Sequence, residues 1–321
     1  MKVGVLTSGG DSPGMNACIR AIVRVGIFHE LEIVGIKGGL QGILDKKFQP
    51  FEARSVGNII HRGGTILTTG RSKEYRTEAG QKKAARILKE EGFDALIAIG
   101  GNGTMRALEI LGDLWDGQII GLPGTIDNDV YGTDFSIGFD TAVNNAIEAV
   151  DKIRDTAQSF DRFFLIETMG RDRGEIALHV GICCGAEAIV IPETPTDLDA
   201  IADHIIAGRE RGKTFAFIIV AEGDEEGDAM EISKKLSGRV RENCRVSVLG
   251  YIQRGGSPSR QDRILASKLG SYAIECLTAG KSGILVGEID GEVAETEFAD
   301  TYSKQKPLNE TLLKLVDPLS I

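Results

Sequence analysis

Three short apolar segments of the chain each end in glycine and small polar residues. The resulting loops read Thr7-Ser8-Gly9-Gly10-Asp11-Ser12-Pro13-Gly14, Gly100-Gly101-Asn102-Gly103-Thr104 and Gly121-Leu122-Pro123-Gly124-Thr125-Ile126-Asp127-Asn128-Asp129. Because glycine lacks a Cβ, backbone N–H groups in such loops approach a ligand closely, and a following helix N-terminus adds positive partial charge. The aspartates Asp11, Asp127 and Asp129 are groups that hold Mg²⁺ or accept a proton. The sequence therefore predicts a pocket for a nucleotide or a phosphate group.

Turn geometry alone explains any single one of these loops equally well, since strand-to-helix turns use glycine. The occurrence of three loops together with three aspartates favours the ligand pocket.

Two common nucleotide-binding patterns are disfavoured. The P-loop pattern G-x-x-x-x-G-K-S/T begins with a glycine that this chain lacks. Ala207 stands at that first position before Gly212-Lys213-Thr214, and Glu275 stands there before Gly280-Lys281-Ser282. The dinucleotide fingerprint fails because Arg106 stands where the third glycine is required.

Short β-branched runs alternate with helical patterns along the whole chain. Strands are expected at residues 3–7, 33–36, 95–99, 119–122, 163–167, 188–191, 215–221 and 246–252, and helices at 77–91, 141–157, 199–211 and 259–278. Most strand runs are apolar without alternation, which is typical of parallel strands covered by helices on both faces. The pattern predicts a doubly wound α/β fold. Parallel strands bring the glycine-rich loops to one edge of a sheet, where ligands bind.

The first helix after the opening strand shows a clear division of its faces. Cys18, Ile22 and Val25 follow a helical spacing, while Arg20 and Arg24 fall on the opposite face. We expect this helix to bury one side and to present two guanidinium groups on the other.

The composition is that of an ordinary globular protein, with 321 residues, 42% hydrophobic and 26% charged. This length suggests two domains, although one large α/β unit remains open, and a boundary near residues 138–142 is expected.

The net charge of −10 argues against nonspecific binding to nucleic acid or to an anionic membrane, so a polyanionic ligand requires local arginine clusters. Five cysteines without C-x-x-C spacing, and no signal or membrane-spanning segment, predict a cytoplasmic protein.

Several motifs together resemble the bacterial type of ATP-dependent 6-phosphofructokinase. They are Ser8-Gly9-Gly10-Asp11, Gly-Gly-x-Gly-Thr at 100–104, Pro123 to Asp129, Met169-Gly170-Arg171 and Gly250-x-Ile252-Gln253-Arg254-Gly255-Gly256-Ser257-Pro258. The resemblance spans about residues 3 to 265 and implies two doubly wound, mostly parallel, three-layer domains. It implies an ATP-binding domain at 1–138 plus 251–301 and a sugar-phosphate domain at 139–250 plus 302–321. The implied reaction transfers the ATP γ-phosphoryl group to the 1-hydroxyl of fructose 6-phosphate, as in glycolysis.

The resemblance also assigns roles within the active site. None of the four histidines, His29, His61, His179 and His204, lies in the loops, so a carboxylate must act as the base. By resemblance Asp127 is that base, with Thr125 and Arg171 as further catalytic residues. The implied sugar-phosphate residues are Thr125, Ile126, Asp127, Arg162, Met169, Gly170, Arg171, Glu222, Arg245, Tyr251 and Arg254. Asp129 resembles a second acidic residue of the site, and a purely local hydrogen-bonding role for it is equally open.

Nucleotide and subunit contacts are implied in the same way. ATP is expected at Gly10, Arg71, Ser72, Gly101, Asn102, Gly103 and Thr104. Glycine at 103 and 124 leaves room for ATP, whereas pyrophosphate-using relatives typically carry aspartate and lysine there. The equivalents of Arg162 and Arg245 serve a neighbouring subunit's site, which implies a homotetramer. For a lone arginine, an ordinary surface ion pair is the usual explanation.

A second set of charged residues resembles the effector site of bacterial members. It comprises Arg20, Arg24, Arg54, Arg154, Gly185, Glu187, Arg211 and Lys213. The resemblance implies allosteric regulation by ADP, bound through Mg²⁺ at Glu187, or by phosphoenolpyruvate. Solvated helix charges are the alternative for Arg20 and Arg24.

Two positions depart from the family pattern. Asn102 replaces the aspartate that serves the Mg²⁺ of MgATP, and Tyr251 replaces a histidine near the sugar phosphate. An amide oxygen still ligates Mg²⁺ but brings no charge, so a weakened metal site and a slow or regulatory paralogue are one hypothesis. A pyrophosphate-dependent enzyme is another. The Asn102-Gly103 pair also raises the hypothesis that Asn102 deamidates.

Overall fold

The computed structural model describes residues 1–160, 162–240 and 244–319. The chain forms two compact units, the first made of Met1–Thr141 and Arg254–Lys306, the second of Ala142–Gln253 and Pro307–Ile321. The chain passes from the first unit to the second in helix α5 (Phe139–Phe160) and returns at the 3₁₀ helix η2 (Gly250–Arg254). The units therefore divide after residues 141, 253 and 306, a few residues beyond the boundaries expected from the sequence.

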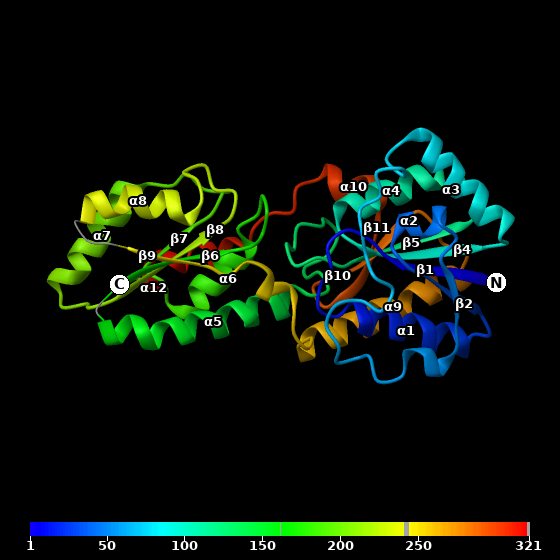
Figure 1. Ribbon diagram of the computed structural model, residues 1–321, viewed down its shortest axis with the longest axis horizontal. Coiled ribbons are helices and arrows are strands. Elements are labelled where there is room, and N and C mark those ends of the chain that lie inside the picture. The colour runs from blue at the N-terminus through cyan, green and yellow to red at the C-terminus, as the bar shows by residue number, and fades with distance from the viewer. Residues whose placement is uncertain (161, 241–243, 320–321) are drawn as a thin grey trace. The chain divides into compact units, whose positions relative to one another are not determined.

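The first unit contains a seven-stranded sheet of order β11-β10-β5-β4-β1-β2-β3 (Figure 1). Its strands are β1 (Lys2–Thr7), β2 (Glu32–Ile36), β3 (Phe48–Phe51), β4 (Ala95–Gly100), β5 (Gln118–Pro123), β10 (Ile284–Ile289) and β11 (Glu292–Glu297). The five inner strands are parallel, and the edge strands β3 and β11 are antiparallel to their neighbours.

Helices cover both faces of this sheet. One face packs against α1 (Met15–Phe28) and α9 (Arg260–Thr278), the other against α2 (Leu40–Leu44), α3 (Glu78–Glu90), α4 (Asn102–Gly112) and α10 (Phe298–Ser303). A short 3₁₀ helix, η1 (Ala53–Val56), lies beside α1. Two separate apolar clusters fill the two faces, which explains why the parallel strands are apolar on both sides. In α1, Cys18 and Ile22 are fully buried, whereas Arg24 is exposed, as the helical spacing predicts.

The second unit contains a parallel four-stranded sheet of order β7-β8-β6-β9 in its described part. Its elements are β6 (Phe163–Thr168), β7 (Ala188–Val190), β8 (Ala216–Ala221), β9 (Arg245–Val248), α6 (Glu175–Cys184), α7 (Leu198–Glu210), α8 (Ala229–Val240), α11 (Glu310–Leu313) and α12 (Val316–Leu319). In Figure 1, α7 and α8 lie on one side of this sheet, and α5 and α6 lie on the other.

Several of the elements expected from the sequence need correction. The strand expected at 246–252 ends at Val248, and Gly250, with a φ of 52°, begins η2 instead. The edge strand β3 and the hairpin of β10 and β11 were not expected; β3 is short and β11 is largely polar, whereas β10 is apolar and mostly buried. Helix α4 begins at Asn102, so Asn102 to Thr104 form a first helical turn rather than a loop.

A buried carboxylate fixes the start of α5. Asp262, in the first turn of α9, accepts hydrogen bonds from the backbone N–H groups of Gly138 at 2.7 Å and Thr141 at 2.8 Å, and from the Thr141 hydroxyl. The Thr141 hydroxyl in turn accepts from the backbone N–H of Ser259 at 2.9 Å. The N-termini of α5 and α9 are thus joined by one polar network.

Candidate functional site

The topology of the first unit places the three glycine-rich loops together. The chain leaves β1 for β2 on one side and leaves β4 for β5 on the other, so the strand order reverses between β1 and β4. Ligands bind at such a reversal, outside the carboxyl ends of the strands. The loops also contact each other directly, since Ser8 N–H donates to the Ile99 carbonyl at 2.9 Å and Gly124 N–H to the Gly100 carbonyl at 3.0 Å.

The two glycines expected to select the donor differ in their surroundings. A Cβ on Gly124 would lie 2.6 Å from Cγ2 of Ile99 and 3.3 Å from Cε of Met15, both in the core. Gly124 is therefore required by packing, because the position that a Cβ would take faces the core rather than a ligand. A Cβ on Gly103 would meet nothing within 4 Å. Of the two positions, the structure leaves only Gly103 with open space beside it.

The loop that carries Asp127 is held from several sides. The Asp127 N–H donates to the Thr125 hydroxyl at 3.2 Å, and the Ser136 hydroxyl donates to the Thr125 carbonyl at 2.8 Å. Asn128 adopts a left-handed φ of 51° and accepts a hydrogen bond from Ser136 N–H at 2.9 Å. Asp127 itself is only 6% exposed. Asn128 and Ser136 were not among the expected site residues, although asparagine tolerates the left-handed conformation that a turn requires.

Asn102 and Asp129 are in direct contact. The Asn102 side-chain Nδ2 donates to Oδ2 of Asp129 at 2.9 Å and to its backbone carbonyl at 3.2 Å. Oδ1 of Asn102 is buried and accepts no hydrogen bond from the part of the chain that the structure describes. A buried oxygen beside a carboxylate is suited to a hard cation such as Mg²⁺.

Among the described residues, no group of three or more His, Cys, Asp or Glu side chains is arranged to hold a metal ion. Mg²⁺ in phosphoryl-transfer sites is usually bound by one or two carboxylates and completed by substrate phosphates and water. The Asn102 and Asp129 oxygens fit that kind of site.

The segment before α3 closes over the loop after β1. Thr69 donates its hydroxyl to the Gly9 carbonyl at 3.0 Å. The Ser72 hydroxyl donates to the Gln41 side chain at 2.6 Å and accepts from Tyr75 N–H at 2.9 Å. Ser72 therefore supports this turn, while its neighbour Arg71 is exposed at the surface.

Arg254 lies against the first glycine-rich loop. A Cβ on Gly10 would stand 3.5 Å from Nη1 of Arg254, so the guanidinium group covers that face of the loop. By resemblance, Gly10 was expected at the nucleotide and Arg254 at the sugar phosphate. The structure brings these two residues together in the first unit.

In the second unit, Glu222 holds the turn that follows β6. Its Oε1 accepts hydrogen bonds from the backbone N–H groups of Gly170 at 3.2 Å and Arg171 at 2.8 Å. Arg171 has a left-handed φ of 57°, which is costly for a residue with a side chain unless its surroundings fix it. The buried Gln253 side chain accepts from Met169 N–H at 3.3 Å. Gln253 belongs to the family-like motif, but the sequence analysis gave it no role.

Three of the four arginines expected at the sugar phosphate fall at two opposite edges of the second sheet, whereas Arg254 belongs to the first unit. Arg171 and Glu222 follow the carboxyl ends of β6 and β8, which are adjacent strands. Arg162 precedes β6, and Arg245 opens the neighbouring strand β9 opposite Phe164, so both lie at the amino edge. A strand of six residues separates the two edges by about 20 Å. One phosphate group cannot contact both sets within a single copy of this unit.

Part of the expected effector set also gathers at the amino edge of this sheet. Glu187 accepts from Phe217 N–H at 2.5 Å and forms an ion pair with Lys213 at 3.4 Å. Arg154 donates to the Cys184 carbonyl, beside Gly185, and lies 4.9 Å from the Phe217 ring centre.

The other expected effector residues are more accessible. Arg211 is exposed at the end of α7. In the first unit, Arg20 is half-buried on α1, and the exposed Arg54 pairs with Glu52 at 2.7 Å. Tyr251, expected near the sugar phosphate, is also largely exposed, in η2.

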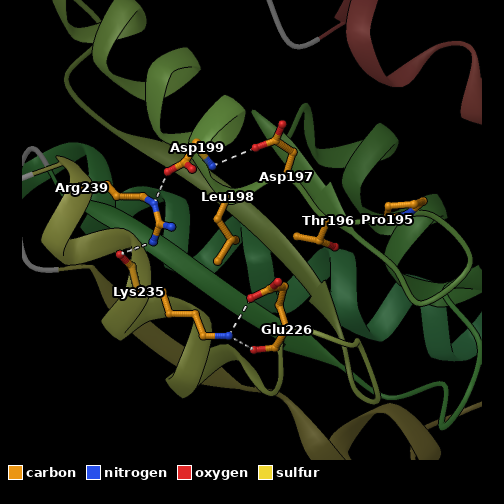
Figure 2. Close-up of a pocket in the computed structure, with 8 residues that line it drawn as sticks. All are labelled: Pro195, Thr196, Asp197, Leu198, Asp199, Glu226, Lys235 and Arg239. Atoms are coloured by element: carbon orange, nitrogen blue, oxygen red, sulfur yellow. Dashed lines mark hydrogen bonds and ion pairs between the residues drawn. The ribbon is translucent and has the colours of Figure 1, made fainter.

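Figure 2 shows a pocket of about 540 Å³ between the start of α7 and helix α8. Two ion pairs cross it, Lys235 to Glu226 at 2.6 Å and Arg239 to Asp199. Asp197 accepts hydrogen bonds from the first N–H groups of α7 at 3.0 Å. The charged groups of this pocket thus form ion pairs with each other or cap α7. None of the expected site residues lines it.

The comparisons with known proteins identify the family of the chain. The family model described as Phosphofructokinase matches residues 2–277. The chain belongs to the phosphofructokinase family. A relative from Thermus thermophilus, named ATP-dependent 6-phosphofructokinase 1, is 49% identical over 100% of this chain and 99% of its own length. A second, ATP-dependent 6-phosphofructokinase from Cytophaga hutchinsonii, is 48% identical over 99% of this chain and 98% of its own length.

Solved structures of phosphofructokinases share the fold. The Saccharomyces cerevisiae phosphofructokinase has a TM-score of 0.90 at 30% identity; the match covers 100% of this chain and 48% of the yeast chain, about half its length. A pyrophosphate-dependent phosphofructokinase from Marinobacter aquaeolei has a TM-score of 0.85 at 19% identity and covers 99% of this chain and 91% of its own. This second likeness concerns the fold alone. Within the described residues, no helix of this family member is long and apolar enough to cross a membrane.

Proposed function

We propose that this phosphofructokinase-family chain transfers the γ-phosphoryl group of ATP to the 1-hydroxyl of fructose 6-phosphate. The products are fructose 1,6-bisphosphate and ADP. The observation that carries the proposal is the buried Asp127, in a loop fixed by Thr125 and Ser136, beside two glycine-rich loops at the strand-order reversal. Relatives that are 48–49% identical along nearly their whole length are named for the same reaction.

In the proposed reaction, the sugar O1 forms a bond to the γ-phosphorus while the bond from that phosphorus to the β,γ-bridging oxygen breaks. Asp127 accepts the proton that the 1-hydroxyl loses, and ADP leaves with the bridging oxygen. The loop at Gly10 and the segment from Gly101 to Thr104, at the N-terminus of α4, bind the nucleotide phosphates. Arg71 and Ser72 contribute to ATP binding. Arg171 balances the charge of the transferring group, because phosphoryl transfer depends mainly on position and electrostatics.

The proposal divides the substrates between the units. The first unit, with the loops around Gly10 and Gly103, binds ATP. The second unit, with Met169 to Arg171 and Glu222, binds the sugar phosphate. Asn102 Oδ1 and Asp129 would hold a Mg²⁺ ion that arrives with the nucleotide, and such an ion neutralises phosphate charge. The protein would act in the cytoplasm.

ATP, rather than pyrophosphate, is the proposed donor. Open space beside Gly103 leaves room for a nucleotide, while Gly124 is fixed by packing and carries less weight in this choice. Purified protein with fructose 6-phosphate and Mg²⁺ is expected to turn over with ATP and to show at most a trace of activity with pyrophosphate. A higher rate with pyrophosphate would replace this donor assignment. Very slow turnover with either donor would favour the regulatory-paralogue alternative, which the neutral Asn102 motivates.

Arg162 and Arg245 are proposed to act at the site of a second copy, because they lie at the sheet edge opposite Arg171. The functional oligomer would be a homotetramer. The cluster of Arg154, Glu187 and Lys213 would bind ADP or phosphoenolpyruvate as an effector, with Mg²⁺ at Glu187 in the case of ADP.

Mixed oligomers test the shared site. Arg162→Ala and Asp127→Asn oligomers are each expected to be nearly inactive. When the two proteins are dissociated together and reassembled, some sites combine Asp127 from one chain with Arg162 from another. Activity is therefore expected to rise well above that of either parent. Reassembly that native mass spectrometry confirms, without a gain in activity, would contradict the assignment of Arg162 to a second copy.

A further inference from the structure

The contact between Asn102 and Asp129 sets the charge of the site where a cation would bind. Nδ2 of Asn102 donates to one carboxylate oxygen of Asp129 at 2.9 Å and to its carbonyl at 3.2 Å. Both side chains are partly buried, between the first turn of α4 and the loop after β5. The hydrogen bond therefore joins two segments that are 27 residues apart in the sequence.

This contact requires a donor at position 102. An ionised aspartate there would offer only acceptor oxygens, so it would face the Asp129 carboxylate without a proton between them. Two negative charges about 3 to 4 Å apart repel strongly at a partly buried site. A cation between them would remove that repulsion. With asparagine, the same contact is an attractive, charge-assisted hydrogen bond that needs no cation.

The N-terminus of α4 favours the same arrangement. Asn102 is the first residue of this eleven-residue helix, so the positive end of the helix dipole lies beside the pair. Its positive partial charge stabilises one nearby carboxylate, that of Asp129.

We propose that Asn102 is a positioning residue for Asp129, and that the pair forms a one-charge site that is organised before any cation binds. In this arrangement Asp129 supplies the charge, and Oδ1 of Asn102 supplies a neutral oxygen. The inference deepens the proposed function, on which it rests for the identity of the cation. Its consequence is that the loop keeps its geometry in the metal-free protein.

Thermal unfolding of the full-length protein, in EDTA and in excess Mg²⁺ without nucleotide, tests the pair. Wild type is expected to melt at nearly the same temperature in both conditions. Asn102→Asp is expected to melt about 5 °C lower in EDTA, because repulsion replaces the hydrogen bond, and to recover most of this loss in Mg²⁺. Asn102→Ala is the matched control, since it removes the donor without adding charge. It is expected to lose less stability and to gain nothing from Mg²⁺.

A charge-swapped variant completes the test. Asn102→Asp combined with Asp129→Asn keeps one donor, one carboxylate and the same net charge. It is expected to melt above Asn102→Asp in EDTA, although it loses the bond to the backbone carbonyl of residue 129, and to be insensitive to Mg²⁺. The proposal is overturned if Asn102→Asp melts like wild type in EDTA, if Mg²⁺ does not restore it, or if the swap is as unstable as Asn102→Asp alone. Failure of the wild type to phosphorylate fructose 6-phosphate would instead refute the proposed function and leave these melting results standing.

Discussion

Asp127→Asn is expected to lower kcat by about 10³-fold, which is the size of effect that loss of a general base produces. Asparagine has the same shape as aspartate, and the backbone N–H of residue 127 still donates to the Thr125 hydroxyl. The loop should therefore stay in place while the proton acceptor is lost. Steady-state kinetics with ATP and fructose 6-phosphate measure the change in kcat, and KM for both substrates should change little.

An exposed carboxylate of the same unit provides the control for this variant. Asp116 lies between α4 and β5 and is exposed. Asp116→Asn removes one negative charge without touching the three glycine-rich loops, and it is expected to keep the wild-type kcat. If Asp127→Asn retains kcat within tenfold of wild type while its melting temperature is unchanged, Asp127 is not the base.

Asp262→Ala is expected to lower the free energy of unfolding by about 4 kcal/mol or more, because three buried donors lose their acceptor. These donors are the N–H groups of Gly138 and Thr141 and the Thr141 hydroxyl. Denaturant unfolding followed by circular dichroism measures the loss. A cost below 1 kcal/mol would show that the network at the start of α5 contributes little.

The cost of this substitution should depend on pH. Burial raises the pKa of Asp262 to about 6, although its hydrogen bonds with Thr141 and Gly138 act to lower the pKa. A carboxyl group whose pKa is higher in the folded state contributes stability that is fully present below the unfolded pKa of about 3.9 and is lost as the pH rises through about 6. The difference in unfolding free energy between wild type and Asp262→Ala should therefore be about 1.4 kcal/mol larger at pH 5 than at pH 8. A difference that grows with pH would mean that the hydrogen bonds outweigh burial.

The sequence predicted those parts of the site that depend on local pattern. The apolar runs before residues 8, 101 and 124 indicated parallel strands, and parallel strands must end at one sheet edge. The position of Asp127 at that edge followed from the same pattern. The edge strands β3 and β11 were not predicted, because β3 is only four residues long and β11 lacks an apolar run. Strand β10 was missed although it begins with an apolar run.

The partners of the side chains could not be read from local pattern. The Asn102 contact with Asp129 spans 27 residues, and the Glu222 contacts with Gly170 and Arg171 span 52 and 51. Such pairs depend on which strands become neighbours, which only the folded sheet determines. For the same reason, the sequence alone did not show that Gly124 is required by packing against Ile99, whereas Gly103 faces open space.

The most direct test of the proposed function is identification of the product by ³¹P nuclear magnetic resonance. Wild-type protein is incubated with ATP, fructose 6-phosphate and Mg²⁺, with Asp127→Asn as the parallel sample. The proposal predicts that ATP signals are replaced by ADP signals as a second sugar phosphate forms on C1, in equal amounts, at a rate far above that of the variant. Conversion of ATP to ADP and free phosphate without a sugar bisphosphate, or no conversion at all, would contradict it.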